Sequence, residues 1–336
     1  MRRGARAKGR EGTHTATRVR RRARMASNVS AFFREKYERD ARKNWDIFYK
    51  HHGENFFRDR HWLAREWPEH FASADASSSA PDLSSERKDY RRGPAPASAN
   101  EGADGSRTFL EIGCGVGNTV FPLLELDPRA TVYCCDFSAR AVELVRKRAM
   151  TLTNERDRSR VKAFVCDVTC ESLAEHVPAK SVDVATLIFA LSAMSKPKME
   201  YALRNLSTVM RAEQRGTICV RDYAAGDLAQ ERFDGKDAQK LSENFYVRSD
   251  GTRAYYFTAD DLTELFAAQD MEMREMFVHE RTITNRAQDV DMNRRWIQAS
   301  FASARLGADE FEPPPPDAQR APPWASTARR RDAEEH

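Results

Sequence analysis

The chain has 336 residues, 40% of them hydrophobic and 32% charged, and a formal net charge of +4. This length and apolar fraction suit one large folded domain with extensions, and they exclude a chain too short or too polar to bury a core. No apolar run approaches the length of a transmembrane helix, so we expect a soluble protein.

The positive charge is concentrated in the first 24 residues, which hold ten Lys and Arg side chains against the single acid Glu11. An Arg-rich, acid-poor segment is typical of an organelle-targeting leader, of a disordered arm that holds RNA non-specifically, or of translated sequence ahead of a functional start at Met25. We expect residues 1–29 to be a disordered leader. The expected compartment is the cytoplasm, with the mitochondrion or a plastid as the alternatives.

Residues 30–72 are dense in aromatic and charged side chains and predict a helical element. Trp45, Phe48 and Tyr49 share one helical face through their spacing of three and four residues. Such a face could lie across a ligand pocket and place aromatic rings against a bound cation. From these residues alone, an ordinary packing helix is the preferred interpretation.

Two segments lack the large apolar side chains that a packed element needs. Residues 73–107 predict a disordered linker between the N-terminal element and the catalytic domain. Residues 304–336, which include four consecutive prolines, predict a disordered tail.

A short apolar run that ends in glycines at alternate positions, Phe109–Asn118, predicts a strand, a tight turn and the start of a helix. The residue three positions after Gly115 is Asn118, so the spacing differs from the G-x-G-x-x-G of dinucleotide-binding folds. The pattern is acid-x-G-x-G-x-G, led by Glu111, which is typical of S-adenosylmethionine methyltransferases of the Rossmann-like class. On its own, this triplet could also be only a tight turn.

Two acids follow at the ends of the next apolar runs. Asp136 ends the run Thr131–Asp136, at the place where this fold puts the carboxylate that accepts a hydrogen bond from a ribose hydroxyl. Asp167 ends the run Val161–Asp167 and is suitably placed to accept from an adenine amino group. A helix N-cap is the alternative for each acid. Glycines and acids at three successive strand ends favour the donor site.

Strands and helices alternate over residues 109–221, which predicts an α/β fold: a Rossmann-like, mostly parallel, doubly wound sheet. Residues 244–257 carry two β-rich runs around an Asp-Gly pair and predict a hairpin. Residues 273–284 and 293–302 predict a closing antiparallel pair. We therefore expect the methyltransferase domain to span residues 108–303.

With these residues assembled, residues 32–302 resemble the tRNA N3-methylcytidine methyltransferases, a family that modifies the anticodon loop. The stretches that carry the resemblance are Lys43–Lys50, Asn55–Trp62, Glu111–Asn118, Cys135–Ser138, Leu187–Ala193, Arg221–Tyr223 and Glu243–Arg253. The glycine turn is common to many methyltransferases, whereas the N-terminal stretches and the hairpin are more specific. The chain departs from the family pattern at Ser195–Lys198 and in its long linker, neither of which touches the cofactor residues.

The resemblance implies two sets of contacts. The residues implied to contact the donor S-adenosylmethionine are Trp45, Tyr49, Gly113, Asp136, Asp167 and Ile188. The N-terminal stretch is similar to the part of the family that grips RNA, and its candidates for tRNA contact are Phe56, Phe57, Arg60, His61 and Trp62. The resemblance also implies tRNA as the partner, with help in some members from an aminoacyl-tRNA synthetase such as seryl-tRNA synthetase. We expect neither a metal ion nor a membrane among the partners.

The expected reaction is methyl transfer to cytosine N3, whose lone pair is unprotonated at neutral pH and exposed once the base is unpaired. No general base is needed, so the rate should come chiefly from proximity and orientation. Asp222, at the end of the fifth strand, is the candidate that orients the base and stabilises the charge developing on the ring. Its neighbours Arg221 and Tyr223 are further substrate candidates. The alternative for Asp222 is a structural role in fixing Arg221.

Two other functions stay open. The same machinery could act on another RNA base or on a small molecule, although Phe189–Ser192 lacks the Asn/Asp-Pro-Pro-Tyr group with which amino-group methyltransferases hold an sp2 nitrogen. Outside the enzymes, a non-catalytic RNA-binding subunit is the alternative, and the intact glycines and acids argue against it. Donor binding would distinguish these functions.

Overall fold

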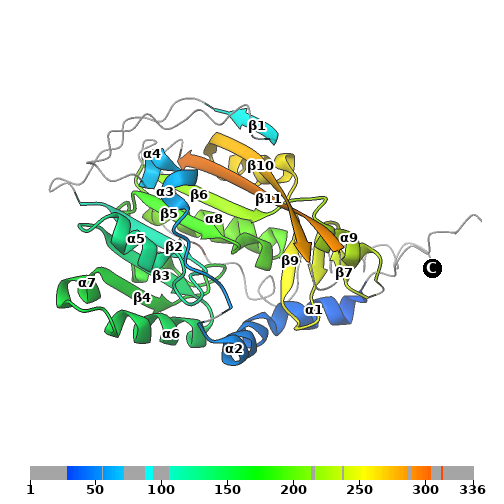
Figure 1. Ribbon diagram of the computed structural model, residues 1–336, viewed down its shortest axis with the longest axis horizontal. Coiled ribbons are helices and arrows are strands. Elements are labelled where there is room, and N and C mark those ends of the chain that lie inside the picture. Colours follow the sequence, from blue (N-terminus) through cyan, green and yellow to red (C-terminus); the bar gives the residue numbers. More distant parts are fainter. Residues whose placement is uncertain are drawn as a thin grey trace, which may run out of the picture.

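The computed structural model describes residues 29–54, 56–71, 88–93, 106–212, 216–236, 238–285, 290–303 and 312. Its centre is an eight-stranded sheet in the order β1-β10-β11-β6-β5-β2-β3-β4 (Figure 1). The strands of this sheet are β1 (Lys88–Arg92), β2 (Thr108–Ile112), β3 (Thr131–Asp136), β4 (Val161–Val165), β5 (Val184–Ile188), β6 (Thr217–Tyr223), β10 (Met271–Asn285) and β11 (Val290–Ser303). A three-stranded sheet contains β7 (Lys240–Ser242), β8 (Phe245–Val247) and β9 (Arg253–Tyr255).

Helices precede, connect and follow these strands. They are α1 (Ala31–Arg39), α2 (Ala41–His52), α3 (Leu63–Glu66), α4 (Pro68–Phe71), α5 (Val120–Leu126), α6 (Ala139–Met150), α7 (Glu155–Arg160), α8 (Lys196–Val209), α9 (Leu228–Asp234) and α10 (Ala259–Ala267). Two short 3-10 turns are η2 (Leu173–Glu175) and η3 (Leu191–Ala193). In the view of Figure 1, α1 and α2 lie along the lower side of the molecule, below β9 and beside α6.

The sheet buries side chains on both of its faces. Along β2, Phe109 packs into the apolar core that includes residues of α3, α4 and α5. Its neighbours Leu110 and Ile112 pack into the core on the other face, with residues of α8 and α10. Alternate side chains of a strand point to opposite faces, so the apolar runs of the sequence are strands buried on both sides. The predicted Rossmann-like fold is confirmed.

The strand directions follow the prediction. β2 pairs in parallel with β3 and β5, and β4 and β6 extend the parallel part on either side. β10 and β11 form the predicted closing antiparallel pair, and β11 pairs antiparallel with β6. The predicted hairpin is formed by β8 and β9, and β7 joins it as a third strand.

Strand β1 lies inside residues 73–107, which the composition predicted to be a disordered linker. It pairs antiparallel with β10 at the edge of the large sheet, and Gly93 N donates to Arg274 O at 2.7 Å. The sequence Lys-Asp-Tyr-Arg-Arg has no apolar alternation. Backbone pairing with β10 and an ion pair of 2.9 Å between Arg91 and Asp260 hold this strand at the sheet edge. Apart from Val29, residues 88–93, Ser106, Arg107 and Glu312, the predicted leader, linker and tail lie outside the described residues.

Candidate active site

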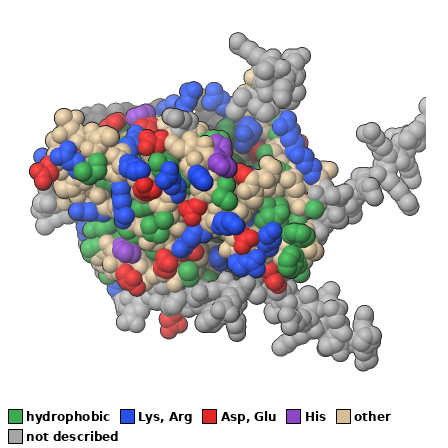
Figure 2. All heavy atoms as spheres, turned by 90° about the horizontal axis from the view of Figure 1, so that it is seen from below, with side chains coloured by type: hydrophobic (Ala, Val, Ile, Leu, Met, Phe, Trp, Pro, Cys, Tyr) green, Lys and Arg blue, Asp and Glu red, His purple; other side chains and the backbone are tan. Residues whose placement is uncertain are grey.

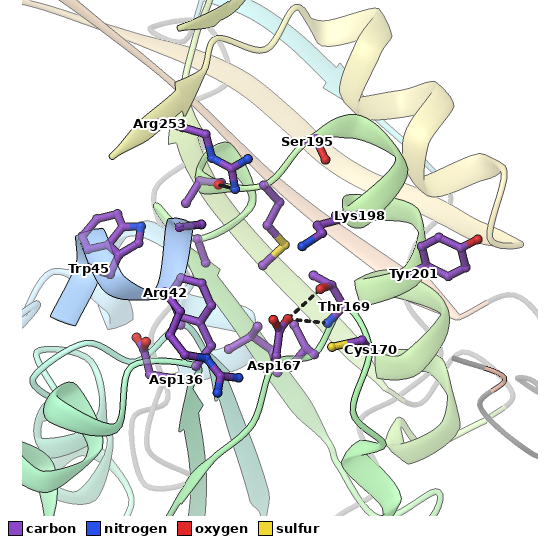
Figure 3. Close-up of a pocket in the computed structure, with 18 of the residues that line it drawn as sticks. Arg42, Trp45, Asp136, Asp167, Thr169, Cys170, Ser195, Lys198, Tyr201 and Arg253 are labelled. Carbon is purple, nitrogen blue, oxygen red and sulfur yellow. Dashed lines mark hydrogen bonds between the residues drawn. The ribbon is translucent and has the colours of Figure 1, made fainter. Parts of the chain in front are cut away.

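A cavity of about 970 Å³ lies at the carboxyl ends of the parallel strands. Its walls come from α1 and α2, from the glycine turn after β2, from the segments after β3 and β4, from the start of α8 and from β9. Asp136 and Asp167 lie at one end of it, and Arg253 and Lys198 lie towards the other (Figure 3). In doubly wound sheets ligands bind at this edge, where the strand order changes direction.

The glycine turn forms the floor of the cavity through Gly113, and its backbone approaches other groups closely. Gly113 has a φ of 68°, and a Cβ on it would lie 2.8 Å from the Cβ of Ala190. Gly115 has a φ of 54°, and a Cβ on it would lie 2.9 Å from the hydroxyl oxygen of Tyr49. Both positions therefore require glycine for conformation and for space.

Asp136 connects the end of β3 to the glycine turn. Its carboxylate accepts hydrogen bonds from Gly115 N at 3.0 Å and from Ser138 N at 2.9 Å. Burial raises the pKa of Asp136 to about 6, although these two hydrogen bonds act in the opposite direction. Its side chain lines the cavity.

Asp167 stands at the adjacent strand end. Its Oδ1 accepts from Thr169 N at 3.1 Å and from Thr169 Oγ1 at 2.6 Å, which fixes the carboxylate in a tight turn after β4 (Figure 3). Both acids were predicted from sequence, and the structure brings them together on one side of the cavity.

Helix α2 covers the glycine turn with two aromatic side chains. The rings of Trp45 and Tyr49 stack with their centroids 5.7 Å apart, and both residues line the cavity. Burial raises the pKa of Tyr49, with Asp136 adding to the effect, so the phenol stays neutral. The helix is held down by Asp46, which accepts a hydrogen bond from Ser138 Oγ at 2.5 Å. The predicted aromatic face therefore lies on the cavity.

A buried ionic cluster that the sequence did not indicate closes the opposite end of the cavity. Glu38 of α1 forms an ion pair with Arg253 of β9 and another, of 3.0 Å, with Lys198 of α8. Burial alone would raise the pKa of Glu38, but the two cations lower it to about 2. Arg253 also donates to Ala193 O at 3.0 Å. No local pattern links these residues, because 215 positions separate Glu38 from Arg253.

Two predicted site residues lie in the interior. Ile188 at the end of β5 belongs to the apolar core on the α5 side of the sheet. Asp222 was predicted to face the base, but its fully buried carboxylate accepts hydrogen bonds from Ser192 N and Tyr223 N, both at 2.9 Å. Burial raises the pKa of Asp222 to about 6. In this position Asp222 fixes η3 against the end of β6.

Arg60 was predicted to contact tRNA, and its guanidinium instead lies beneath the glycine turn. Its Nη1 donates to Glu111 Oε1 at 3.0 Å and to Thr119 Oγ1 at 2.6 Å, and its backbone N donates to Asn118 O at 2.8 Å. Burial raises the pKa of Glu111 to about 7, and the charge of Arg60 opposes this rise. The side chain of Asn118 donates to Phe57 O at 3.2 Å, so the glycine turn and the segment around residues 57–60 hold each other.

The remaining N-terminal candidates lie at the surface. Phe56 and Phe57 are 53% and 38% exposed, and their rings meet edge to face at 4.7 Å. Phe56 also contacts the ring of His52 at 4.6 Å. His61 is exposed, with its Nδ1 3.6 Å from a carboxylate oxygen of Glu125. The exposed pair Phe56 and Phe57 is thus positioned next to the glycine turn.

A second group of partly exposed aromatic and basic side chains surrounds Arg221. Its guanidinium lies 4.4 Å from the ring centre of Trp62 and 5.8 Å from that of Trp296, and burial lowers its pKa to about 10. Tyr223 contacts the ring of Phe189 at 4.9 Å. The sequence did not single out Trp296, although the pairing of the closing strands places it opposite Tyr223. We call Trp62, Arg221, Tyr223 and Trp296 the tryptophan–arginine cluster.

The structure also bears on metal ions and membranes. Within the described ranges, His, Cys, Asp and Glu side chains do not gather in threes or more in a way that could hold a metal ion. Among the described helices, none is long and apolar enough to cross a membrane.

Comparison with known proteins adds the family. Residues 110–218 match the family model of a methyltransferase domain. The chain is 40% identical over 274 residues to the human tRNA N(3)-cytidine methyltransferase METTL6, which covers 81% of this chain and 84% of that protein. It is also 40% identical over 275 residues to tRNA N(3)-cytidine methyltransferase METTL2 of Danio rerio, covering 80% and 75%. A solved S-adenosylmethionine-dependent methyltransferase from Methanosarcina mazei aligns with a TM-score of 0.45 and 15% identity over 59% of this chain and 92% of that one.

Proposed function

The chain belongs to the family of tRNA N(3)-cytidine methyltransferases, and we propose that its target is a cytidine in the anticodon loop. It is an S-adenosylmethionine-dependent enzyme that methylates N3 of cytidine in tRNA. The observation that carries the anticodon-loop assignment is the position of Phe56 and Phe57, exposed aromatic rings fixed beside the donor floor. Unpaired, splayed-out bases are what such rings recognise in RNA.

The residues of the cavity fit S-adenosylmethionine. The glycine turn gives a floor without side chains, and Asp136 and Asp167 supply acceptors for ribose hydroxyls and for the adenine amino group. Trp45 and Tyr49 present aromatic faces above the turn, where a sulfonium cation would be stabilised by their ring electrons. We assign the donor contacts to these residues and to the backbone of Gly113.

When bound, the donor supplies a methyl group already activated for transfer. The lone pair of cytosine N3 forms the new bond to the methyl carbon while the sulfur–carbon bond breaks, and the pyrimidine takes up the positive charge. The chain needs no base for this step. Orientation of the two reactants is worth on the order of 7–11 kcal/mol in favourable cases, so the walls that fix both molecules carry the catalysis.

The flanking nucleotides would contact the surface beside the cavity. The tryptophan–arginine cluster offers indole faces and a guanidinium, the groups that bind bases and phosphates of single-stranded RNA. Figure 2 shows the side on which α1 and α2 lie, where Lys and Arg side chains are numerous and acidic side chains lie between them. We therefore expect individual Lys and Arg side chains, and not one large basic face, to attract the phosphates.

The test is to incubate the protein with S-adenosylmethionine and unmodified tRNA, digest the RNA and identify the methylated nucleosides by mass. We expect N3-methylcytidine, and its position follows from primer extension because a methyl group on N3 blocks base pairing. Asp136→Ala serves as the control without donor binding. N3-methylcytidine at a position outside the anticodon loop would contradict the assignment. If no tRNA acquires N3-methylcytidine although the protein binds the donor, the protein does not methylate tRNA without a partner.

Two further parts of the proposal concern partner and place. If tRNA alone gives no product, we expect seryl-tRNA synthetase to restore methylation, since some members of the family are helped by such a partner. We also propose the cytoplasm as the compartment, with the mitochondrion or a plastid as alternatives because the first 24 residues are rich in Arg. Imaging of the full chain with a C-terminal fluorescent tag distinguishes the compartments.

A further inference from the structure

Phe189, the first residue after β5, has a backbone conformation that aromatic residues rarely adopt. Its φ is 58°, in the left-handed region that favours glycine. Glycine at this position would relax the backbone, yet the chain carries one of the largest side chains there. A strained residue at a strand end beside a ligand cavity points to a role for the side chain.

The strain is maintained because the backbone around Phe189 is fixed on both sides. Phe189 N donates to Arg221 O at 2.7 Å, which continues the pairing of β5 and β6. The next residue, Ala190, packs directly against Gly113 of the donor floor. Two residues further, Ser192 N donates to the buried carboxylate of Asp222 at 2.9 Å. The backbone conformation of Phe189 is therefore set by the fold.

The ring lies between the donor cavity and the tryptophan–arginine cluster. Phe189 is a lining residue of the cavity, as are Asp136 and Trp45. Its ring also contacts that of Tyr223 at 4.9 Å, with the planes tilted by 46°. The guanidinium of Arg248, the residue after β8, lies 5.2 Å from the ring centre of Tyr223. Phe189 thus connects the donor site with the surface proposed for the flanking nucleotides.

We propose that the ring of Phe189 stacks on the target cytosine and holds the pyrimidine with its N3 edge towards the donor methyl group. The proposal rests on the proposed function, because it concerns the substrate of that same site. An aromatic platform suits this task since base–aromatic stacking fixes the plane of a base without engaging its edges. The N3 lone pair stays free to react, and no proton has to move.

The experiment compares Phe189→Leu, which removes the ring face, with Phe189→Tyr, which keeps it. Phe233→Leu is the matched control. Phe233 is also partly exposed, and its substitution removes ring contacts with Tyr246 and Tyr256 away from the cavity. The substrate is a stem-loop RNA with one unpaired cytidine, and the readouts are kcat, KM for RNA and the Kd of S-adenosylhomocysteine. A second stem-loop carries fluorescent pyrrolocytidine at the target position and reports stacking directly.

For Phe189→Leu we expect kcat/KM for RNA to fall about tenfold or more, because loss of a base–aromatic stack weakens base binding by that order, with the Kd of S-adenosylhomocysteine unchanged. Phe189→Tyr should retain turnover, and pyrrolocytidine fluorescence should be quenched by the wild type and by Phe189→Tyr but much less by Phe189→Leu. Equal turnover of Phe189→Leu and Phe233→Leu would overturn the role of Phe189. The proposed function would not be affected, because the wild type would still make N3-methylcytidine. A parallel loss of donor affinity would overturn the role of Phe189 too, because that result indicates a structural role. Failure of the wild type to make N3-methylcytidine on tRNA, even with seryl-tRNA synthetase added, would overturn both.

Discussion

Arg60→Ala tests the ion pair beneath the glycine turn and decides whether Arg60 belongs to the donor floor or to the RNA surface. The substitution removes the cation that lies 3.0 Å from Glu111, whose carboxylate is fully buried. Glu111 stands on β2 just before the glycines, so an uncompensated charge there should displace the floor itself.

The magnitude follows from burial. The side chain of Glu111 is 0% exposed and that of Arg60 is 14% exposed, so the pair is screened little by solvent. Removing one partner of a buried pair costs about 3–5 kcal/mol, because the other charge stays buried. For a folded part of this size, 1 kcal/mol shifts the melting temperature by about 2–4 °C, so we expect Tm to fall by about 6–20 °C.

The pH dependence gives a sharper signature. The pKa of Glu111 is raised from its ordinary 4.5 to about 7 by burial, so its contribution to stability is complete below pH 4.5 and is lost as the pH rises through 7. Arg60 opposes this rise, and its removal should raise the pKa of Glu111 further. The loss of stability in Arg60→Ala should therefore be larger at pH 8.5 than at pH 5.5.

Thermal unfolding of the wild type, Arg60→Ala and the double variant Arg60→Ala/Glu111→Gln at both pH values measures this. The neutral amide in the double variant should recover most of the loss at pH 8.5, because no buried charge remains. Calorimetric titration with S-adenosylhomocysteine should show weaker donor binding in Arg60→Ala. The reasoning is refuted if Arg60→Ala unfolds like the wild type at both pH values and only RNA binding weakens.

Three further predictions concern the same site. Gly115→Ala should weaken binding of S-adenosylhomocysteine about tenfold or more, since at least one contact near Tyr49 must break. Gly53→Ala is the control, because Gly53 has the same φ of 54° but open space around it. An equal effect of both substitutions would assign the loss to backbone strain alone. Donor affinity should fall as the pH drops through about 6, where burial has raised the pKa of Asp136 and protonation removes an acceptor; a pH profile that Asp136→Asn leaves unaltered would exclude this carboxylate as the cause. Asp222→Asn should lower the free energy of unfolding by about 1–3 kcal/mol, because an amide N–H then faces a backbone N–H; normal stability with abolished turnover would instead indicate that Asp222 touches the base.

The donor floor was predictable because its signals are local. Asp136 ends β3, and Gly113 and Asp167 follow the ends of β2 and β4 by one and two residues. The apolar pattern marks these strands, and parallel strands bring their carboxyl ends to one edge. The closing pair β10 and β11 was predictable for the same reason, from two long β-rich runs in sequence.

Sequence patterns are less informative where distant residues decide the environment of a side chain. The sequence around Arg60 is basic and predicts an exposed side chain. The fold instead pairs Arg60 with Glu111, which is 51 positions away. Likewise, Glu38 looks like an ordinary helix-surface acid until the fold brings Arg253 and Lys198 to it. Asp222 has a strand-end position that suggests catalysis, and only the path of η3 reveals the backbone groups that it binds.

The cavity is built from residues inside the matched methyltransferase domain and from residues outside it. Residues 110–218 match that domain and supply the floor of the cavity, including both acids and Phe189. The walls around this floor come partly from the start of α8, inside the matched range, and partly from α1, α2 and Arg253 of β9, outside it. We therefore expect the walls from outside the matched range, together with Phe189 and the surface beside the cavity, to contribute to substrate selection. The hydrogen bonds between Asn118 and residues 57–60 fix the segment after α2 against the floor, so we expect this added part to hold a bound base in a defined orientation.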